Sequence, residues 1–213
     1  MNPLRLLVLL TLFLSVVCNA QDLGKDLTKL QKRGINGYFE KNQEVGYTGK
    51  VFKLHENGQI ELKGQLIKGK FDGLKVEWHK NGQKESEGTY KDGKQDGLWT
   101  EWHENGQKKS EENWKDGKKD GLYVSWHENG QKRFVETYKD GKAEGLQVEW
   151  HSNGQKESEF LFKNGKEDGL QLMWHENGQK KLEENYKHGK LISKKYWNSK
   201  GEPVDSFEEA DKK

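Results

Sequence analysis

Residues 98–121 read LWTEWHENGQKKSEENWKDGKKDG, and this stretch decides the fold because its pattern recurs along most of the chain. A Trp-His pair followed by a glycine-containing turn returns every 24 residues. Its tryptophans are Trp78, Trp102, Trp126, Trp150 and Trp174. A fixed period of about 20 to 50 residues is typical of a stacked array in which each unit contacts only its neighbours.

Each repeat contains two runs of β-compatible residues, separated by turn signals such as Asn105-Gly106 and Asp116-Gly117. Such dipeptides between extended runs favour β-hairpins. The sequence therefore predicts an all-β fold, an elongated single-layer antiparallel sheet of tandem 24-residue hairpins. The expected turn glycines are Gly82, Gly106, Gly130, Gly154 and Gly178 in the first turns, and Gly93, Gly117, Gly141, Gly165 and Gly189 in the second.

The strand register follows from the alternation of apolar residues. Leu74, Val76 and Trp78 fall on one face of their strand. Three-residue loops, with glycine in the left-handed position, set Val76 opposite Ser86 and keep that face apolar. We therefore predict such loops at both turns. The predicted inward face carries the Leu, the Val or Leu, the Trp, and the aromatic before the second turn. Those aromatics are Tyr90, Trp114, Tyr138, Phe162 and Tyr186.

The first 20 residues do not belong to the array. Arg5 precedes an apolar run, and a small residue, Ala20, ends the segment. This layout predicts a signal peptide, residues 1–20, and an exported protein that is periplasmic or secreted. Lipid anchoring at Cys18 is the alternative, and membrane contact is expected only in that case. Val17 stands where lipoprotein signals usually carry a small residue, which favours cleavage after Ala20.

The remaining sequence divides into three parts. Residues 21–45 are the expected N-terminal cap, and residues 46–201 form an array of about six to seven repeats. Residues 202–213 are a charged C-terminal tail, in which Pro203 ends the pattern. The caps are expected to protect the ends of the sheet from pairing with other strands.

Composition narrows the range of partners. The chain has 37 basic and 35 acidic residues, a net charge of +2, and the two signs are mixed along every repeat. Arg5, Arg33 and Arg133 are its only arginines, so bidentate phosphate or base recognition is poorly supplied. No nucleic-acid partner is expected. The single cysteine, Cys18, lies in the leader, so the exported chain has no internal disulfide.

A recurring histidine is the feature most suggestive of chemistry. Equivalent strands lie at least ~9.5 Å apart, whereas two imidazoles on one zinc lie within ~4.2 Å of each other. Successive repeats therefore do not share a metal, and the histidine is interpreted as a polar residue at the hairpin entrance. Serines and carboxylates alternate with lysines as solvated charge pairs. We expect no catalytic residue, metal or cofactor. The histidines are His55, His79, His103, His127, His151 and His175.

Two aromatic residues depart from the repeat pattern. Trp99 and Tyr123 occupy a position that is Lys75, Gln147 or Gln171 in other repeats, and the predicted register places it on the outer face. Exposed aromatic rings on a rigid strand are typical of binding surfaces. Trp99 and Tyr123 are therefore the candidate binding residues. The alternative is ordinary packing of these rings against lysine stems.

The repeat resembles a known family. The stretch from Tyr138 to Gly154, YKDGKAEGLQVEWHSNG, is similar to a MORN repeat in its bacterial variant form. The resemblance covers about residues 46–201. Many bacterial chains of this kind carry a YwqK-type antitoxin-like label, which the resemblance would imply here. Trp99, Tyr123 and Gln147 stand where the ordinary repeat has a second glycine, which favours the variant group and weakens the analogy with membrane-associated members.

These observations predict an exported, non-enzymatic repeat protein that acts as a scaffold for protein-protein interaction. A preformed sheet loses little entropy on binding, so modest contacts over several repeats can sum to a useful affinity. Two alternatives stay open. One is a module that binds cell-wall glycan, and the other is an antitoxin-like neutraliser of a partner protein.

Overall fold

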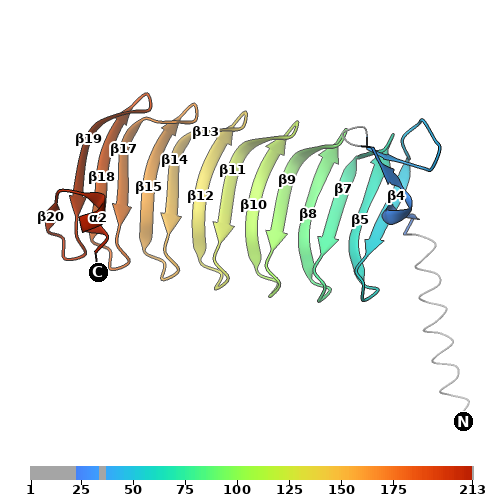
Figure 1. The fold of residues 1–213 in the computed structure, drawn as a ribbon, viewed down its shortest axis with the longest axis horizontal. Helices are drawn as coiled ribbons and strands as arrows, with labels where there is room; N and C mark the ends of the chain where they lie inside the picture. The colour runs from blue at the N-terminus through green and yellow to red at the C-terminus, as the bar shows by residue number, and fades with distance from the viewer. Residues whose placement is uncertain (1–22, 34–36, 213) are drawn as a thin grey trace, which may run out of the picture. The chain divides into compact units, whose positions relative to one another are not determined.

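The computed structural model describes residues 23–33 and 37–212. The predicted signal peptide lies outside the described residues. The chain divides into two compact units with the boundary between Lys94 and Gln95, and each unit is described by itself. Both consist almost entirely of β-strands joined by hairpin turns (Figure 1).

The first unit holds a short N-terminal segment and two long hairpins. Its sheet pairs β4 with β5, β5 with β7 and β7 with β8, all antiparallel, and β1 adds to β4 in parallel. Its elements are β1 (Lys25–Asp26), the 3-10 helix η1 (Leu27–Lys29), β2 (Gln31–Lys32), β3 (Tyr38–Phe39), β4 (Gly49–Leu54), β5 (Ile60–Ile67), β6 (Lys70–Phe71), β7 (Gly73–Trp78) and β8 (Lys84–Lys91).

The second unit continues the same hairpin pattern and ends in a short helix. Its ladders from β9 to β20 are antiparallel. Its elements are β9 (Lys94–Trp102), β10 (Lys108–Lys115), β11 (Lys118–Trp126), β12 (Lys132–Lys139), β13 (Lys142–Ala143), β14 (Gly145–Trp150), β15 (Lys156–Lys163), β16 (Lys166–Glu167), β17 (Gly169–Trp174), β18 (Lys180–Lys187), β19 (Lys190–Trp197), β20 (Pro203–Val204) and α2 (Phe207–Ala210). The predicted single-layer antiparallel sheet of tandem hairpins is therefore confirmed within each unit.

The first turn of each repeat has the predicted three-residue loop. In the hairpin from β9 to β10, the His103 amide donates to the Gln107 carbonyl at 2.9 Å, enclosing three loop residues. The Gly106 amide donates to the His103 carbonyl at 2.9 Å, and Gly106 has a φ of 81°. Glycine adopts this left-handed conformation without the steric cost that a Cβ brings.

The second turn differs from the prediction. Lys115 pairs with Lys118, which leaves a two-residue loop of Asp116 and Gly117. Both loop residues have positive φ, 50° and 78°. These values define a type I′ turn, whose twist matches that of the flanking strands. The prediction of a three-residue loop here was wrong, because Asp-Gly fits the shorter turn equally well.

A β-bulge beside each first turn shifts the register by one residue. Trp78 pairs with Lys84 as expected, but Ser86 pairs with Glu77 and not with Val76. Glu85 is the extra residue, and Lys109 holds the same place between β9 and β10. A bulge leaves one residue unpaired, so the residues beyond it are offset by one position along the partner strand. The alternation of apolar residues along the sequence does not show where such an unpaired residue occurs, so the sequence did not predict the bulge.

The bulge separates two sets of residues that the alternation of the sequence predicts to lie on one face. We call the side of the sheet that carries Leu98, Leu122, Leu146 and Leu170 the leucine face; Val124 and Trp126 lie on it too. The opposite side, the aromatic face, carries Trp99 and Tyr123. The aromatics before the second turns lie on the aromatic face as well. Each of them pairs with the glycine that directly precedes a leucine, and adjacent residues of a strand point to opposite faces. These aromatics are Tyr90 in the first unit and Trp114, Tyr138, Phe162 and Tyr186 in the second.

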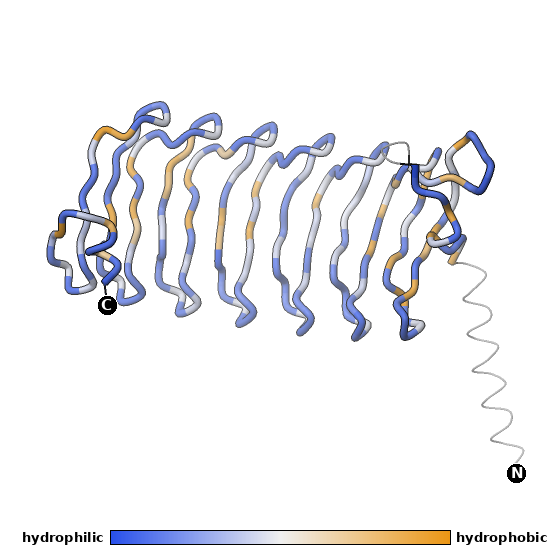
Figure 2. The backbone as a smooth tube through the Cα atoms, in the orientation of Figure 1, coloured by the Kyte–Doolittle hydropathy of each residue, from blue (hydrophilic) through white to orange (hydrophobic). Residues whose placement is uncertain are grey.

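Burial corrects a second expectation, although Val76 and Val148 on the leucine face are buried as predicted. The leucines of the repeats, predicted to point inward, are between 47% and 54% exposed from Leu74 to Leu170. Trp99, predicted to point outward, is only 6% exposed. The turns are hydrophilic, whereas hydrophobic residues occur along the strands (Figure 2).

Each unit has additional packing at its chain end. In the first unit, Leu27 and Leu30 pack with Val51, Leu62 and Leu66 in a buried apolar cluster. In the second unit, parts of the predicted charged tail, residues 202–213, form β20 and α2. The Phe207 ring of α2 lies edge-on to Tyr196 at 6.3 Å, and the Lys181 ammonium lies 4.5 Å from the centre of the Phe207 ring. These contacts cover sheet residues that would otherwise face water.

Candidate binding surfaces

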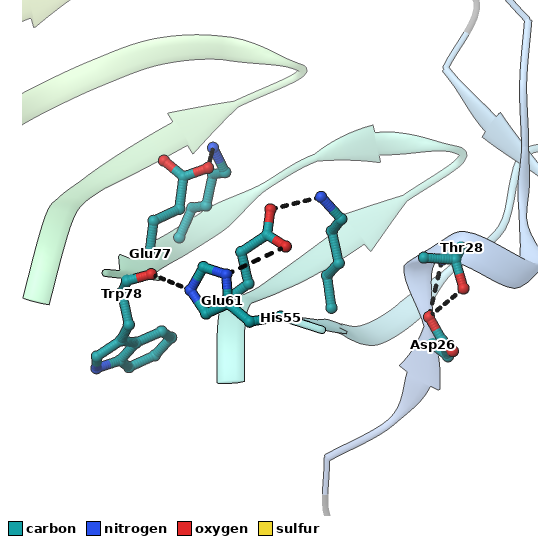
Figure 3. A network of polar contacts seen from close by, with 8 residues as sticks. Asp26, Thr28, His55, Glu61, Glu77 and Trp78 are labelled. Atoms are coloured by element: carbon teal, nitrogen blue, oxygen red, sulfur yellow. Dashed lines mark hydrogen bonds and ion pairs between the residues drawn. The ribbon is translucent and has the colours of Figure 1, made fainter. Parts of the chain in front are cut away.

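The histidines join consecutive repeats through the backbone. The Nε2 atom of His55 lies 2.7 Å from the carbonyl oxygen of Trp78 (Figure 3). The Nε2 atom of His127 lies 2.8 Å from the carbonyl oxygen of Trp150. The same contact links His103 to Trp126, His151 to Trp174 and His175 to Trp197. Each imidazole therefore satisfies a backbone carbonyl of the next hairpin. Within residues 23–33 and 37–212, no three His, Cys, Asp or Glu side chains gather in a way that could hold a metal ion.

Side chains of both turns form similar links between repeats. Asn129 at a first turn donates from Nδ2 to the Ser152 carbonyl at 2.9 Å, 23 residues further on. At a second turn, the Asp140 amide donates to the Asp120 carboxylate at 3.1 Å. Such bonds recur at the equivalent positions of the other repeats. The turn residues thus have a structural role, because each bond spans two successive hairpins.

Serines and carboxylates pair with each other or with lysines. The Ser86 hydroxyl donates to Glu77 at 2.7 Å, and the Lys75 ammonium lies 2.7 Å from the same carboxylate. Burial pushes the pKa of Glu77 upward, but the hydrogen bonds from Lys75 and Ser86 outweigh burial and hold the pKa below its usual value. This carboxylate is therefore held ionised by its partners.

The leucine face exposes a regular apolar row. Leu98, Leu122, Leu146 and Leu170 stand one repeat apart, about 9.5 Å in a regular sheet. Leu161, 39% exposed, pairs with Leu146 and widens the row. Scattered exposed leucines are ordinary, but a contiguous apolar row on a rigid sheet is typical of an interaction surface.

The tryptophans on the same face are covered by lysine side chains. The Lys108 ammonium lies 5.9 Å from the Trp126 ring, and the Lys156 ammonium lies 5.9 Å from the Trp174 ring. Each lysine also pairs with a glutamate three residues on, as Lys180 does with Glu183 at 2.7 Å. The lysine stems shield the indole rings, so the leucines are the more accessible apolar groups.

Trp99 and Tyr123 share one face, as the sequence predicts, but they are not displayed to solvent alike. The prediction that Trp99 is exposed was wrong. The bulge places the aromatics that precede the second turns on the same face of the sheet as Trp99. Tyr123 is half-buried: the Lys119 ammonium lies 4.5 Å from its ring centre, and the Phe134 ring lies 5.6 Å away. This packing matches the alternative of rings against lysine stems.

A groove of about 370 Å³ opens beside Tyr123 on the aromatic face of the second unit. Phe134 and Tyr138 supply further aromatic walls, Ser125 is buried beneath them, and Arg133 and Glu149 lie at the edge. Its lining residues come from β11, β12 and β14, so the sequence alone could not assemble it. The available signal was that Arg133 and Phe134, like Tyr123, depart from the repeat pattern.

Fold and turn geometry together define this protein as a β-hairpin repeat protein. The MORN repeat variant family matches residues 71–92, 95–116, 119–140, 143–164 and 167–188. These matches cover more than half of the chain, so the chain belongs to the MORN repeat variant family. The resemblance seen in the sequence is confirmed. No curated protein matches the chain. In the part of the chain that the structure describes, no helix combines the length and the apolar character needed to span a membrane.

Proposed function

We propose that this chain is an exported, non-enzymatic scaffold that binds another protein through its leucine face. The observation that carries the proposal is the row of about half-exposed leucines on one face of the second unit. Burial of exposed apolar surface is the main favourable term in protein association. The row of leucines therefore offers apolar surface that a bound partner can bury.

The surroundings of the row support a protein partner. Protein interfaces combine an apolar centre with a polar rim. Here the leucines are flanked by paired charges, such as Lys156 with Glu159, and by the shielded tryptophans. The strands are already ordered by hydrogen bonds to both neighbours, so binding orders few additional groups. Burying the remaining half of each leucine contributes about 1 kcal/mol.

Non-enzymatic action is proposed because the repeated polar side chains already have structural partners. The histidines bond to backbone carbonyls of the next repeat, and Ser86 bonds to Glu77. Export is proposed from the apolar segment that ends at Ala20.

The leucine face is tested by a triple variant, Leu122→Ser, Leu146→Ser and Leu170→Ser. Partners retained by the immobilised unmodified chain in extracts of its host are expected to bind the variant about 100-fold more weakly. This follows because three leucines contribute about 3 kcal/mol together, and about 1.4 kcal/mol is a factor of ten. Binding is measured by titrating the recovered partner against both proteins.

The control carries three substitutions at exposed turns, Glu56→Ser, Glu128→Ser and Glu176→Ser, and should bind like the unmodified chain. Circular dichroism of each protein checks that the sheet is retained. Equal affinity for the folded leucine variant and the unmodified chain would contradict the proposal. The mass of the chain recovered from its host also tests export, since a chain starting at Gln21 is expected and an intact Met1 would argue against cleavage.

A further inference from the structure

We infer that the groove beside Tyr123 is a carbohydrate-binding site that takes a neutral pyranose ring. The site lies on the aromatic face, opposite the leucine face, and does not depend on the function proposed above. It is defined by Tyr123, Phe134 and Tyr138 as walls, with Arg133 and Glu149 at its edge.

The residues that line this groove can be compared with those at the equivalent positions of the other repeats. Residues that only stack the hairpins should be alike in every repeat, whereas residues that bind a ligand at one place should differ there. Four lining positions depart together in the repeat of β11 and β12. The position of Tyr123 is occupied in the other repeats by Lys75, Gln147 and Gln171, and by one other aromatic residue, Trp99. The position of Ser125 is occupied by Glu77, Glu101, Glu149 and Met173, and that of Arg133 by Glu85, Lys109, Glu157 and Lys181. The position of Phe134 is occupied by Ser86, Ser110, Ser158 and Leu182.

These departures create the hollow. In the first unit, the Ser86 hydroxyl donates to Glu77 across the strand pair. At the equivalent pair in the groove, Ser125 faces Phe134. The short serine leaves space where other repeats carry a longer side chain, and the phenyl ring forms an apolar wall beside that space. The volume of about 370 Å³ lies in the range of small-molecule sites, about 300–1,000 Å³.

The aromatic walls are held in place by one lysine. The Lys119 ammonium lies 4.5 Å from the Tyr123 ring centre and 5.2 Å from the Tyr138 ring centre. Its charge is balanced by Glu112 at 2.8 Å. The Tyr123 and Phe134 rings meet at 60° with centres 5.6 Å apart. Lys119 covers part of the Tyr123 and Tyr138 rings, so the Phe134 ring is the apolar surface against which the C–H face of a pyranose can pack.

The edge of the groove offers both hydrogen-bond donors and an acceptor. Arg133 Nε lies 3.9 Å from Glu149 Oε1, and the arginine side chain is 59% exposed. A guanidinium donates only and a carboxylate accepts only, so together they match the neighbouring hydroxyl groups of a sugar. Because their charges cancel, a neutral sugar fits better than an acidic one. Burial and the carboxylate of Glu157 raise the pKa of Glu149, against the effect of Arg133.

The test titrates the full-length protein with two soluble probes, cellohexaose and chitohexaose, followed by NMR shifts of the groove residues. Binding of at least one probe is expected. The variant Phe134→Ser restores the residue of other repeats, so its fold should be retained, and it should bind at least about tenfold more weakly, as expected for an aromatic anchor. Arg133→Glu should weaken binding as well, and Phe134→Tyr should preserve it.

The leucine triple variant serves as the control and should bind the sugar like the unmodified chain, so this inference and the proposed function can fail separately. Absence of binding to both probes would overturn the inference, as would equal binding by folded Phe134→Ser. A protein partner lost on Phe134→Ser, without any binding of sugar, would assign the groove to a peptide and overturn it too.

Discussion

Replacing Trp99 by alanine is expected to lower the free energy of unfolding of the second unit by about 3–5 kcal/mol. Trp99 is only 6% exposed, and its strand partner is Glu112. Truncating a buried indole removes a large apolar surface from the fold and leaves a cavity that neighbouring side chains fill only in part. Denaturant unfolding followed by circular dichroism measures the change.

Leu98→Ala is the matched control, because it changes the adjacent residue on the opposite face. Leu98 is 53% exposed, so its truncation should cost no more than about 1 kcal/mol. If Leu98→Ala were as destabilising as Trp99→Ala, or if Trp99→Ala had no effect, the assignment of these residues to the two faces would be wrong.

The variant Leu66→Ala is expected to destabilise the first unit by about 2–5 kcal/mol. Leu66 is fully buried in the cluster that joins the N-terminal segment to the sheet, where Leu27 and Val51 are also buried. Loss of this side chain should weaken the attachment of the N-terminal segment as well as the hairpin itself. Hydrogen exchange resolved by peptide should therefore accelerate in β4 and β5.

Ile67→Ala provides the comparison for this variant. Ile67 is adjacent to Leu66 on β5 and is 39% exposed. Its truncation should leave exchange in β4 and β5 nearly unchanged. Equal acceleration by both variants would mean that the cluster does not hold the N-terminal segment.

The sequence predicted the hairpin period and the first turns because these depend on local chemistry. Asn105-Gly106 recurs at a fixed spacing, and a glycine in the left-handed conformation closes a three-residue loop. The second turn was not determined in this way, since Asp116-Gly117 is compatible with both two and three loop residues. Only the observed pairing of Lys115 with Lys118 distinguishes them.

The two faces could not be predicted because a bulge has no signature in the alternation of residues. Lys109 resembles its lysine neighbour, yet it is left out of the ladder between β9 and β10. One unpaired residue changes which side chains share a face. The bulge therefore places Trp114 on the face that carries Trp99, and not on the face of the leucines.

The candidate groove was predictable only in part. The departure of Tyr123 from the repeat pattern predicts a binding residue, and Tyr123 does line the groove. Arg133 and Phe134 also depart, but the bulge and the pairing of Ser125 with Phe134 were needed to place them beside Tyr123. Comparison of repeats can thus find unusual residues, whereas the register decides which of them meet.

The bulged register is the central claim, and NMR cross-strand contacts between β9 and β10 test it most directly. Nuclear Overhauser effects are expected between the backbone protons of Ser110 and Glu101, which are paired across these strands. A regular ladder, in which Lys109 is paired, would place Ser110 opposite Thr100 instead. Contacts between Ser110 and Thr100, without contacts to Glu101, would contradict the bulge and the division of the residues between the two faces.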